Sequence, residues 1–384
     1  MTAALVLAST SLLLFLWSYG IYPALVERLA RRGPAPEGSA SGETGRGPVS
    51  VDVIVSAADE ESVIGARIGN LLRQRVDGGA SAAVILGCDG CRDGTAAAAR
   101  AAGGERVRVV EFPERRGKAT VLNDLVRMSS ADVLVFTDAN TAFEPGAIAA
   151  LVRRFADPSV GAVCGRLVFE TAAGVRATPE AVYWDRETRT KQAEGELGVC
   201  LGANGAIYAA LRELVQPLPE DTTSMDDFLI PARVAKTGRR VVFAADAVAR
   251  EDSARDVAAE TARRFRIGVG AGQVLRRERW LYAGGRQPLL TLAYLSRKAA
   301  RWLAPVAALA AAVAALFSPV SRPAGLVGLG AATLLLASAR LRPGVGGAWG
   351  RLYYFAVLNV ALALGVSAGL AGYARPAWTR TARS

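Results

Sequence analysis

Long apolar runs without a single charge stand at both ends of this chain of 384 residues. Residues 1–26 could cross a bilayer as a helix, which needs about 20 such residues. A cleaved signal peptide is the alternative, although no basic segment precedes this run and no A-x-A cleavage site follows it. Three further runs come late in the chain: residues 302–321, 323–339 and 352–374. The pattern predicts a membrane protein with one N-terminal span and about three spans in residues 302–374.

Basic residues beside these runs predict the orientation. Three arginines follow the first run directly, and four basic residues precede the second: Arg28, Arg31 and Arg32, then Arg286, Arg297, Lys298 and Arg301. Because such flanks prefer the cytoplasm, residues 50–280 are expected there, at the inner face of the plasma membrane. The basic tail, residues 375–384, does not fit three C-terminal spans, so its side stays open.

Two segments connect the expected spans to the middle of the chain. Residues 27–49 combine a basic flank with a Gly-, Ser- and Pro-rich tether that has too little apolar content to pack. Residues 281–301 interleave apolar and basic side chains, as in a helix that lies in the membrane interface or in an ordinary packed surface helix. The net charge of +11 could also indicate a nucleic-acid partner. The basic residues cluster beside apolar runs instead, which favours membrane lipids.

The middle of the chain alternates apolar strand patterns with helix patterns. Strands are expected at residues 51–56, 82–87, 107–112 and 132–138, and helices at residues 61–74, 95–102 and 118–128. This alternation predicts an α/β fold with a parallel sheet covered on both faces. Ligands of such sheets bind beyond the carboxyl ends of the strands.

Acidic residues follow three of these expected strands. They lie in the segments AADEE (57–61), CDGCRDGT (88–95) and TDAN (137–140). Each segment alone could be a helix N-cap or a turn. Together with Lys118, however, three acidic clusters at one sheet edge can hold a divalent cation and a diphosphate.

The order of these motifs resembles the family 2 glycosyltransferases, which have the GT-A nucleotide-sugar fold. The resemblance continues through further motifs: CGR (164–166), YW (183–184), LGANGA (201–206), MDDF (225–228) and RRFRI (263–267). The flanking spans are similar to those of the membrane-bound, cellulose-synthase-like branch. The resemblance implies a GT-A domain at residues 50–280, between N-terminal and C-terminal transmembrane helices.

The two cysteines of the CDGC segment are interpreted as spacers. Histidine is absent from the chain, so neither a Ser-His-Asp triad nor a His-bearing zinc site can form. A second C-x-x-C is also absent, and a cytoplasmic domain needs no disulfide. In the family pattern small residues flank the aspartates, and Cys88 and Cys91 occupy those places.

The resemblance implies a donor site. The residues that it assigns to the nucleotide-sugar are Ala57, Glu60, Asp89, Lys118, Asp138, Arg263 and Arg266. Glu60 and Asp89 would line a uridine pocket, and Lys118 would face the diphosphate. Arg263 and Arg266 share one helical face and could clamp the same diphosphate, although a solvated basic face would look alike.

A divalent ion, Mg²⁺ or Mn²⁺, is expected at Asp138 and Asn140. Asn140 departs from the family pattern, because the D-x-D motif usually ends in Asp. An amide oxygen can still ligate such an ion, but without a charge.

The resemblance also assigns the reaction chemistry and the acceptor site. Asp227 is the expected general base, beside Asp226, and a plain helix N-cap is the alternative for this pair. Asn204, Gly205 and Trp184 are expected at the acceptor. A turn with positive φ would explain the glycine loop equally well, and core packing would explain Trp184.

These patterns predict an inverting, metal-dependent hexosyltransferase that uses a nucleotide-sugar, which the resemblance implies is a UDP-sugar, and a lipid-linked or growing glycan acceptor. The alternatives are a processive synthase that translocates its product and a catalytically inactive membrane-tethered nucleotide-binding protein. The donor sugar, the acceptor and the oligomeric state stay open.

Overall fold

The computed structural model describes residues 2–32, 50–76, 82–170, 179–252, 257–283, 285, 287–317, 323 and 347–374. The chain forms two compact units. One is built around a β-sheet and runs from Leu25 to Ser253, and the other is helical and combines Met1–Ala24 with Ala254–Ala374. Residues 254–280, which the sequence analysis assigned to the α/β domain, are therefore grouped with the helices.

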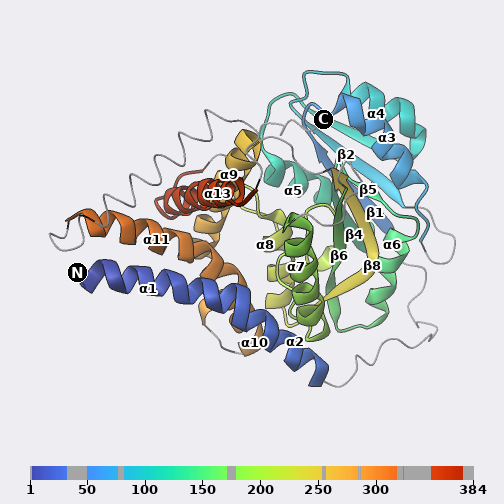
Figure 1. Ribbon diagram of the computed structural model, residues 1–384. Coiled ribbons are helices and arrows are strands. Elements are labelled where there is room, and N and C mark those ends of the chain that lie inside the picture. Colours follow the sequence, from blue (N-terminus) through green and yellow to red (C-terminus); the bar gives the residue numbers. More distant parts are fainter. Residues whose placement is uncertain are drawn as a thin grey trace. The chain divides into compact units, whose positions relative to one another are not determined.

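The sheet has eight strands in the order β3-β2-β1-β4-β7-β6-β8-β5 (Figure 1). Its first half consists of the four expected strands: β1 (Val51–Ala57), β2 (Ala83–Asp89), β3 (Val107–Phe112) and β4 (Val133–Asp138). They are parallel, and their register pairs Ala57 with Cys88 and Ser56 with Asp138. The carboxyl ends of β1, β2 and β4 therefore meet at one edge of the sheet. This confirms the expected α/β fold.

Helices cover both faces of this half. On one face, apolar residues of α3 (Glu61–Leu72), α4 (Thr95–Gly103) and α6 (Ala147–Val152) share a core with alternate residues of the strands. On the other face, α5 (Lys118–Met128) lies against β1 and β2. Each helix therefore returns the chain to the start of a parallel strand, which leaves the polar loops at the opposite edge.

The second half of the sheet has mixed directions. It contains β7 (Tyr208–Leu211), β6 (Val160–Glu170), β8 (Arg240–Asp252) and β5 (Ala142–Phe143), and its helices are α7 (Pro179–Glu196) and α8 (Asp226–Lys236). β8 runs parallel to β6, and β5 pairs antiparallel with the end of β8. Only residues 139–141 separate β4 from β5, and a chain extends at most about 3.5 Å per residue. The end of β8 must therefore lie close to the carboxyl end of β4.

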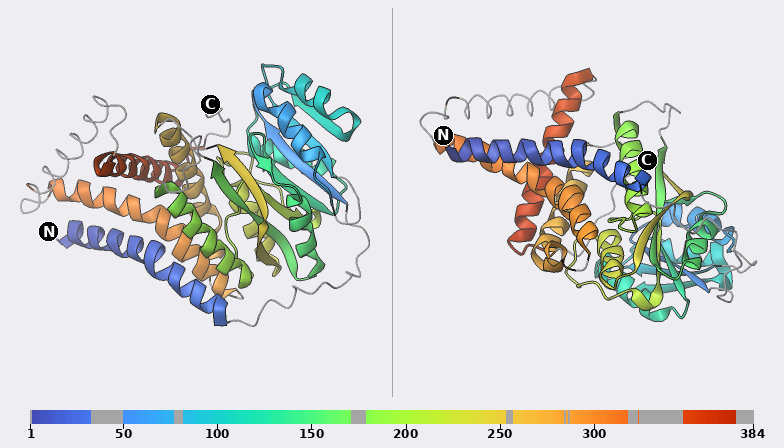
Figure 2. Two further views of the ribbon diagram at one scale, coloured as in Figure 1. Left: turned by 45° about the vertical axis from the view of Figure 1, so that its right-hand side comes forward. Right: turned by 90° about the horizontal axis from the view of Figure 1, so that it is seen from below.

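The helical unit contains the described apolar runs. α1 (Thr2–Leu16) lies beside α11 (Ala300–Phe317), where the Ser11 hydroxyl donates to the Ala304 carbonyl at 2.8 Å (Figure 2). α1 continues through a π-helical turn into α2 (Tyr22–Arg32), and α10 (Pro288–Ala293) continues in the same way into α11. Residues 288–301, part of the segment 281–301 that was expected as an interfacial or packed surface helix, are thus joined to the following span without a break.

Three helices of the described residues are long and apolar enough to cross a membrane. They are Ala3–Arg32, Pro288–Phe317 and Leu352–Leu370. The last belongs to α13 (Gly347–Leu370). The expected span at residues 323–339 lies outside the described residues, apart from residue 323.

α13 packs against α9 (Val257–Arg277) through glycines on both helices. Gly268 and Gly272 of α9 face Gly365 and Gly369 of α13, so the two backbones touch directly. A Cβ atom on Gly268 would lie 2.5 Å from the carbonyl oxygen of Leu362. Such spacing of small residues is typical of tightly packed membrane helices.

Candidate active site

Lys118 brings a positive charge to the sheet edge where β1, β2 and β4 end. It is the first residue of α5, and its Nζ lies 2.8 Å from Asp138 Oδ1 and 3.1 Å from Asp226 Oδ2. Burial acts to lower the pKa of Lys118, but the carboxylates of Asp138 and Asp226 outweigh it and raise the pKa above its ordinary value. The ammonium group is therefore charged at neutral pH and links the end of β4 to the start of α8.

Asp226 and Asp227 are the first two residues of α8, and neither is its N-cap. Met225 is in that position, and both Ser224 and Met225 have positive φ, 53° and 89°. Left-handed backbone at a residue other than glycine costs about 1–3 kcal/mol and is common at functional sites. Because Met225 is the N-cap residue, neither Asp226 nor Asp227 serves as the N-cap, and that alternative for the acidic pair is excluded.

The two neighbouring acids have different surroundings. Asp226 is buried, and its Oδ2 accepts a hydrogen bond from the Tyr208 hydroxyl at 3.4 Å as well as the Lys118 contact. Burial, and then the charge of Asp226, raise the pKa of Tyr208, so its hydroxyl keeps the proton that it donates. Asp227 is only half-buried. Asp226 is thus held among protein groups, whereas Asp227 has an exposed side.

Gly205 lies between Asp138 and Asp227. A Cβ atom at this position would be 3.4 Å from Asp138 Oδ2 and 3.9 Å from Asp227 Oδ2. The backbone of the same loop is fixed to α8, because the Ala203 N–H donates to the Asp227 carbonyl at 2.9 Å. The structure therefore brings together Asp138, Asp227 and Gly205, which the sequence analysis expected at the donor, the general base and the acceptor.

The side chain of Asn204 holds this loop in place. Its Nδ2 donates to the Gly165 carbonyl at 3.0 Å, and its Oδ1 accepts from Lys191 Nζ at 2.6 Å. The positive φ of the loop belongs to Gly202, at 72°. Both ends of the Asn204 amide are thus engaged within the protein, and its expected contact with an acceptor remains a prediction.

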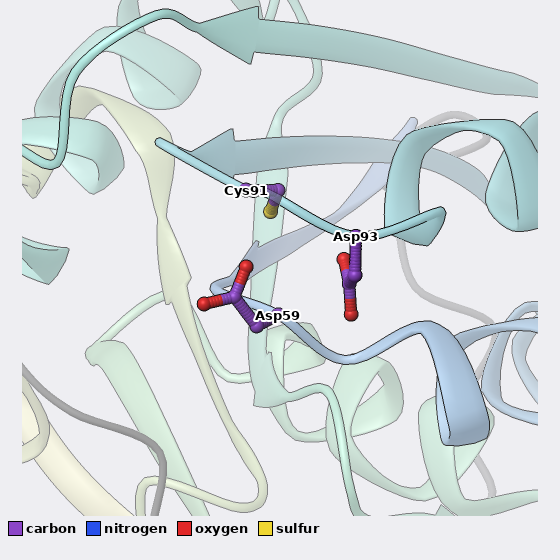
Figure 3. A group of neighbouring side chains, drawn as sticks. All are labelled: Asp59, Cys91 and Asp93. Atoms are coloured by element: carbon purple, nitrogen blue, oxygen red, sulfur yellow. The ribbon is translucent and has the colours of Figure 1, made fainter.

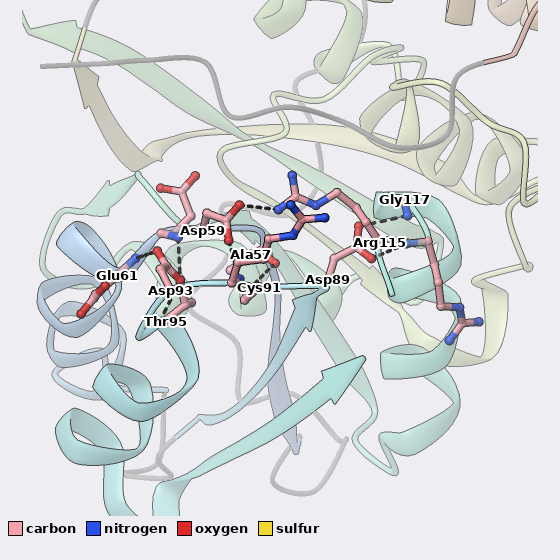
Figure 4. A network of polar contacts seen from close by, with 12 residues as sticks. Ala57, Asp59, Glu61, Asp89, Cys91, Asp93, Thr95, Arg115 and Gly117 are labelled. Carbon is pink, nitrogen blue, oxygen red and sulfur yellow. Dashed lines mark hydrogen bonds and ion pairs between the residues drawn. The ribbon is translucent and has the colours of Figure 1, made fainter. Parts of the chain in front are cut away.

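Asp89 ends β2 and holds the loop that leads to Lys118. It is fully buried, and its two oxygens accept the backbone N–H groups of Arg116 at 2.6 Å and Gly117 at 3.0 Å (Figure 4). The sequence predicted Asp89 in a uridine pocket, but gave no signal that Asp89 binds the backbone of the loop before Lys118. Its contact with a nucleotide stays a prediction.

Three side chains from the loops after β1 and β2 turn toward one another: Asp59, Cys91 and Asp93 (Figure 3). Their potential ligand atoms lie within 4.8 Å of one another, close enough to hold a metal ion. All four carboxylate oxygens already accept hydrogen bonds, from Arg92 N–H and Arg115 to Asp59, and from Thr95 and the Glu61 N–H to Asp93. These bonds fasten the two loops together (Figure 4).

Cys88 and Cys91 are free thiols that flank Asp89 and Gly90. A hydrogen bond between them lowers the pKa of Cys91 to about 7, and this bond together with burial raises the pKa of Cys88. The Cys91 thiol also donates to the carbonyl of Ala57 at 3.6 Å. The cysteines therefore help to hold the loops that carry the acidic residues.

Ala57 ends β1 and Glu60 is the N-cap residue of α3, and both are buried. The Glu60 N–H donates to the Thr95 hydroxyl at 2.8 Å, which joins the loop after β1 to α4. Their expected contacts with the nucleotide-sugar remain predictions.

The other expected site residues lie elsewhere. Arg263 and Arg266 belong to α9 in the helical unit, where Arg263 pairs with Glu260 at 3.3 Å. Trp184 is part of α7, but its side chain lies outside the described part of the structure. The roles of these three residues remain predictions.

Asn140 lies in the short connection between β4 and β5, and its contact was not foreseen. Its Nδ2 donates to Glu251 Oε1 at 3.1 Å, and Glu251, near the end of β8, is buried. The two residues are 111 positions apart in the chain. Without knowledge of the β5–β8 pairing, no sequence signal connects them.

Comparisons with known proteins show the family and the fold of this chain. The family described as "Glycosyltransferase like family 2" matches residues 48–270, more than half of the chain. The succinoglycan biosynthesis protein ExoU of Rhizobium meliloti (strain 1021) is 32% identical over 111 residues, which are 28% of this chain and 31% of that protein. This chain thus spans about a third of the length of that relative.

A solved structure is similar over nearly the whole chain. It is the mannosyltransferase PcManGT from Pyrobaculum calidifontis, in complex with GDP-Man and Mn²⁺. The similarity has a TM-score of 0.65 at 23% identity and covers 95% of this chain and 99% of that chain. At this identity the similarity shows a common fold.

Proposed function

This chain belongs to glycosyltransferase-like family 2 and has the GT-A fold, and from that premise we propose that it is an inverting, metal-dependent hexosyltransferase of the plasma membrane. Its donor would be a nucleoside-diphosphate sugar. Its acceptor would be a lipid-linked or growing glycan in the synthesis of a cell-surface polysaccharide or glycolipid.

The observation that carries the proposal is the set of charges around Gly205. Asp227 and Asp138 border this position, and Lys118 bridges Asp138 and Asp226. A carboxylate with an exposed side, together with a half-buried cation at Asp138 and Asp226, suits a reaction that removes a proton and releases an anionic diphosphate.

In the proposed reaction Asp227 accepts the proton of an acceptor hydroxyl. The hydroxyl oxygen forms a bond to the anomeric carbon as the bond from that carbon to the diphosphate oxygen breaks. The electron pair of the broken bond leaves with the nucleoside diphosphate, and the configuration inverts. Asp226, held by Lys118 and Tyr208, would keep the start of α8 in place and thereby position Asp227.

The residues present fit a divalent cation. Asp138 Oδ1 faces Lys118 while Oδ2 faces Gly205, and Asn140 adds an amide oxygen two residues later. Such hard oxygen donors suit Mg²⁺ or Mn²⁺. When bound, the ion would offset the negative charge that develops on the leaving diphosphate.

The proposal leaves two candidates for the nucleotide of the donor sugar. The sequence resemblance favours a UDP-sugar. GDP-mannose is the second candidate, because the solved structure of similar fold contains GDP-Man and Mn²⁺. The succinoglycan role in the name of the curated relative supports a glycan acceptor.

The proposed location rests on the three membrane-spanning candidates and on the basic flanks of the apolar runs. The GT-A domain would face the cytoplasm, where nucleotide-sugars are made. A processive synthase needs in addition a path for its product through the bilayer, and an inactive nucleotide-binding protein would have no use for Asp227.

The test is a donor screen with the full chain in nanodiscs. UDP- and GDP-sugars would be supplied with Mg²⁺ or Mn²⁺ and a membrane lipid extract, and the released nucleoside diphosphate would be measured. We expect release with one donor class that disappears on chelation and in Asp227→Asn. Equal release by wild type and Asp227→Asn would refute the assignment of the base.

A further inference from the structure

We propose that Glu251 is a positioning residue of the metal site, which sets the orientation of the Asn140 amide. This inference rests on the proposed metal-dependent function. It explains how a neutral side chain can serve at the position where the family usually has an aspartate.

The amide of Asn140 has two chemically different ends, and only its oxygen can ligate a cation. Asn140 Nδ2 donates to Glu251 Oε1 at 3.1 Å. An ionised carboxylate only accepts hydrogen bonds, so it binds the NH₂ end of the amide and rejects the oxygen. The Asn140 oxygen is therefore directed away from Glu251, on the other side of the amide group.

The fold holds Glu251 in position for this contact. β5 pairs with the end of β8 through Ala142 with Arg250 and Phe143 with Ala249. Successive strand residues point to opposite faces. Arg250 accordingly points outward, where its Nε donates to Glu144 at 2.8 Å, while Glu251 is 7% exposed.

Asn140 lacks the charge of the usual aspartate, so the direction of its oxygen decides whether it can serve as a ligand. Glu251, buried behind the amide, fixes that direction. Outer carboxylates of this kind orient the ligands of metal ions, and their loss typically weakens metal binding by about 10–100-fold.

The test measures Mn²⁺ binding directly, by electron paramagnetic resonance of free Mn²⁺, with the full chain in nanodiscs and with GDP or UDP present. In Glu251→Gln the side chain offers both an NH₂ group and a carbonyl, so it no longer selects one end of the Asn140 amide. We expect the Kd for Mn²⁺ to rise about tenfold. Glu144→Gln, on the outer face of the same strand pair, is the matched control and should leave the Kd within about twofold of wild type.

Measuring Glu251→Gln in the Asn140→Asp variant as well separates the orienting effect of Glu251 on the amide from a general effect on the structure. The aspartate of Asn140→Asp has two equivalent oxygens and needs no orientation, and the new amide of Glu251→Gln can donate a hydrogen bond to it. Because two adjacent carboxylates repel each other in Asn140→Asp, we expect Glu251→Gln to leave the Kd of that variant unchanged or to lower it. An equal loss in both backgrounds would overturn the inference.

Asp138→Asn separates the existence of the metal site from the role of Glu251 in that site. If it removes Mn²⁺ binding while Glu251→Gln binds like wild type, the metal site stands and the inference about Glu251 fails. If wild type itself binds no Mn²⁺ with either nucleotide, the proposed metal dependence fails and the inference fails with it.

Discussion

Removing the half-buried cation Lys118 from the site should destabilise the sheet-based unit by a predictable amount. In Lys118→Met, Asp138 and Asp226 lose their shared partner. The Lys118 and Asp226 side chains are only 23% and 9% exposed, and the Asp138 side chain is 35% exposed. At 2.8 and 3.1 Å each attraction is about 5–6 kcal/mol for an effective dielectric constant of about 20, and dehydration offsets most of it.

The net cost can be estimated from hydrogen bonds to charged groups, which contribute about 1.5–3 kcal/mol each. Removing one partner of a fully buried ion pair costs about 3–5 kcal/mol. Because Asp138 is partly solvated, we expect about 3 kcal/mol for Lys118→Met. In a domain of this size that corresponds to a fall of roughly 6–12 °C in the unfolding midpoint.

The assay is thermal unfolding of the full chain in one detergent, followed by tryptophan fluorescence. Adding Asp226→Asn to Lys118→Met removes an uncompensated buried charge, so the midpoint should partly recover, whereas Asp226→Asn alone should lower it. The pKa of Lys118 is raised, so its contribution is fully present below the ordinary value of 10.5 and is lost only as the pH rises through the higher value. The difference between wild type and Lys118→Met should therefore be constant between about pH 6 and pH 9. A midpoint unchanged in Lys118→Met, or simple additivity in the double variant, would refute the reasoning.

Three further predictions concern catalysis, the cysteines and topology. Asp227→Asn should keep nucleotide-sugar binding and lower kcat by about 10²–10⁴-fold, because an amide cannot accept the proton; single-turnover kinetics would check this. Cys88→Ser with Cys91→Ser should leave turnover largely intact, since both residues only hold loops, and loss of activity together with bound zinc would contradict it. A cysteine introduced at Gly42 should resist an impermeant thiol reagent in intact cells if the GT-A domain is cytoplasmic. Labelling of this cysteine from outside would contradict the predicted orientation.

The fold, and the meeting of acidic residues at one edge of the sheet, were predictable because they depend on local patterns. Apolar segments of about six residues define β1, β2 and β4, and helical periodicity follows the first two of them. Parallel strands align their carboxyl ends, which brings Ala57, Asp89 and Asp138 to one edge. The N-cap position of Met225 was not predictable, because it depends on the backbone conformation and methionine is not a typical N-cap residue.

Contacts between distant segments were not predictable. The Asn140–Glu251 bond depends on the return of β8 to the end of β4, and the Tyr208–Asp226 bond depends on the packing of β7 and α8. The grouping of α9 with the helical unit also depends on a contact between distant segments. α9 reads as an ordinary amphipathic helix in sequence, but its glycines match those of α13, nearly a hundred residues later.

The glycine contact between α9 and α13 has a consequence for the lipid environment. At Gly268, Gly272, Gly365 and Gly369 no side chain separates the two backbones, so we expect a change in the tilt of α13 to move α9 as well. A membrane helix tilts when its apolar length exceeds the thickness of the hydrocarbon layer. α9 also carries Arg263 and Arg266, the arginines expected at the diphosphate. We therefore expect the acyl-chain length of the surrounding lipids to affect the position of these arginines. Reconstitution in lipids of graded chain length would measure how strongly the rate of sugar transfer depends on that length.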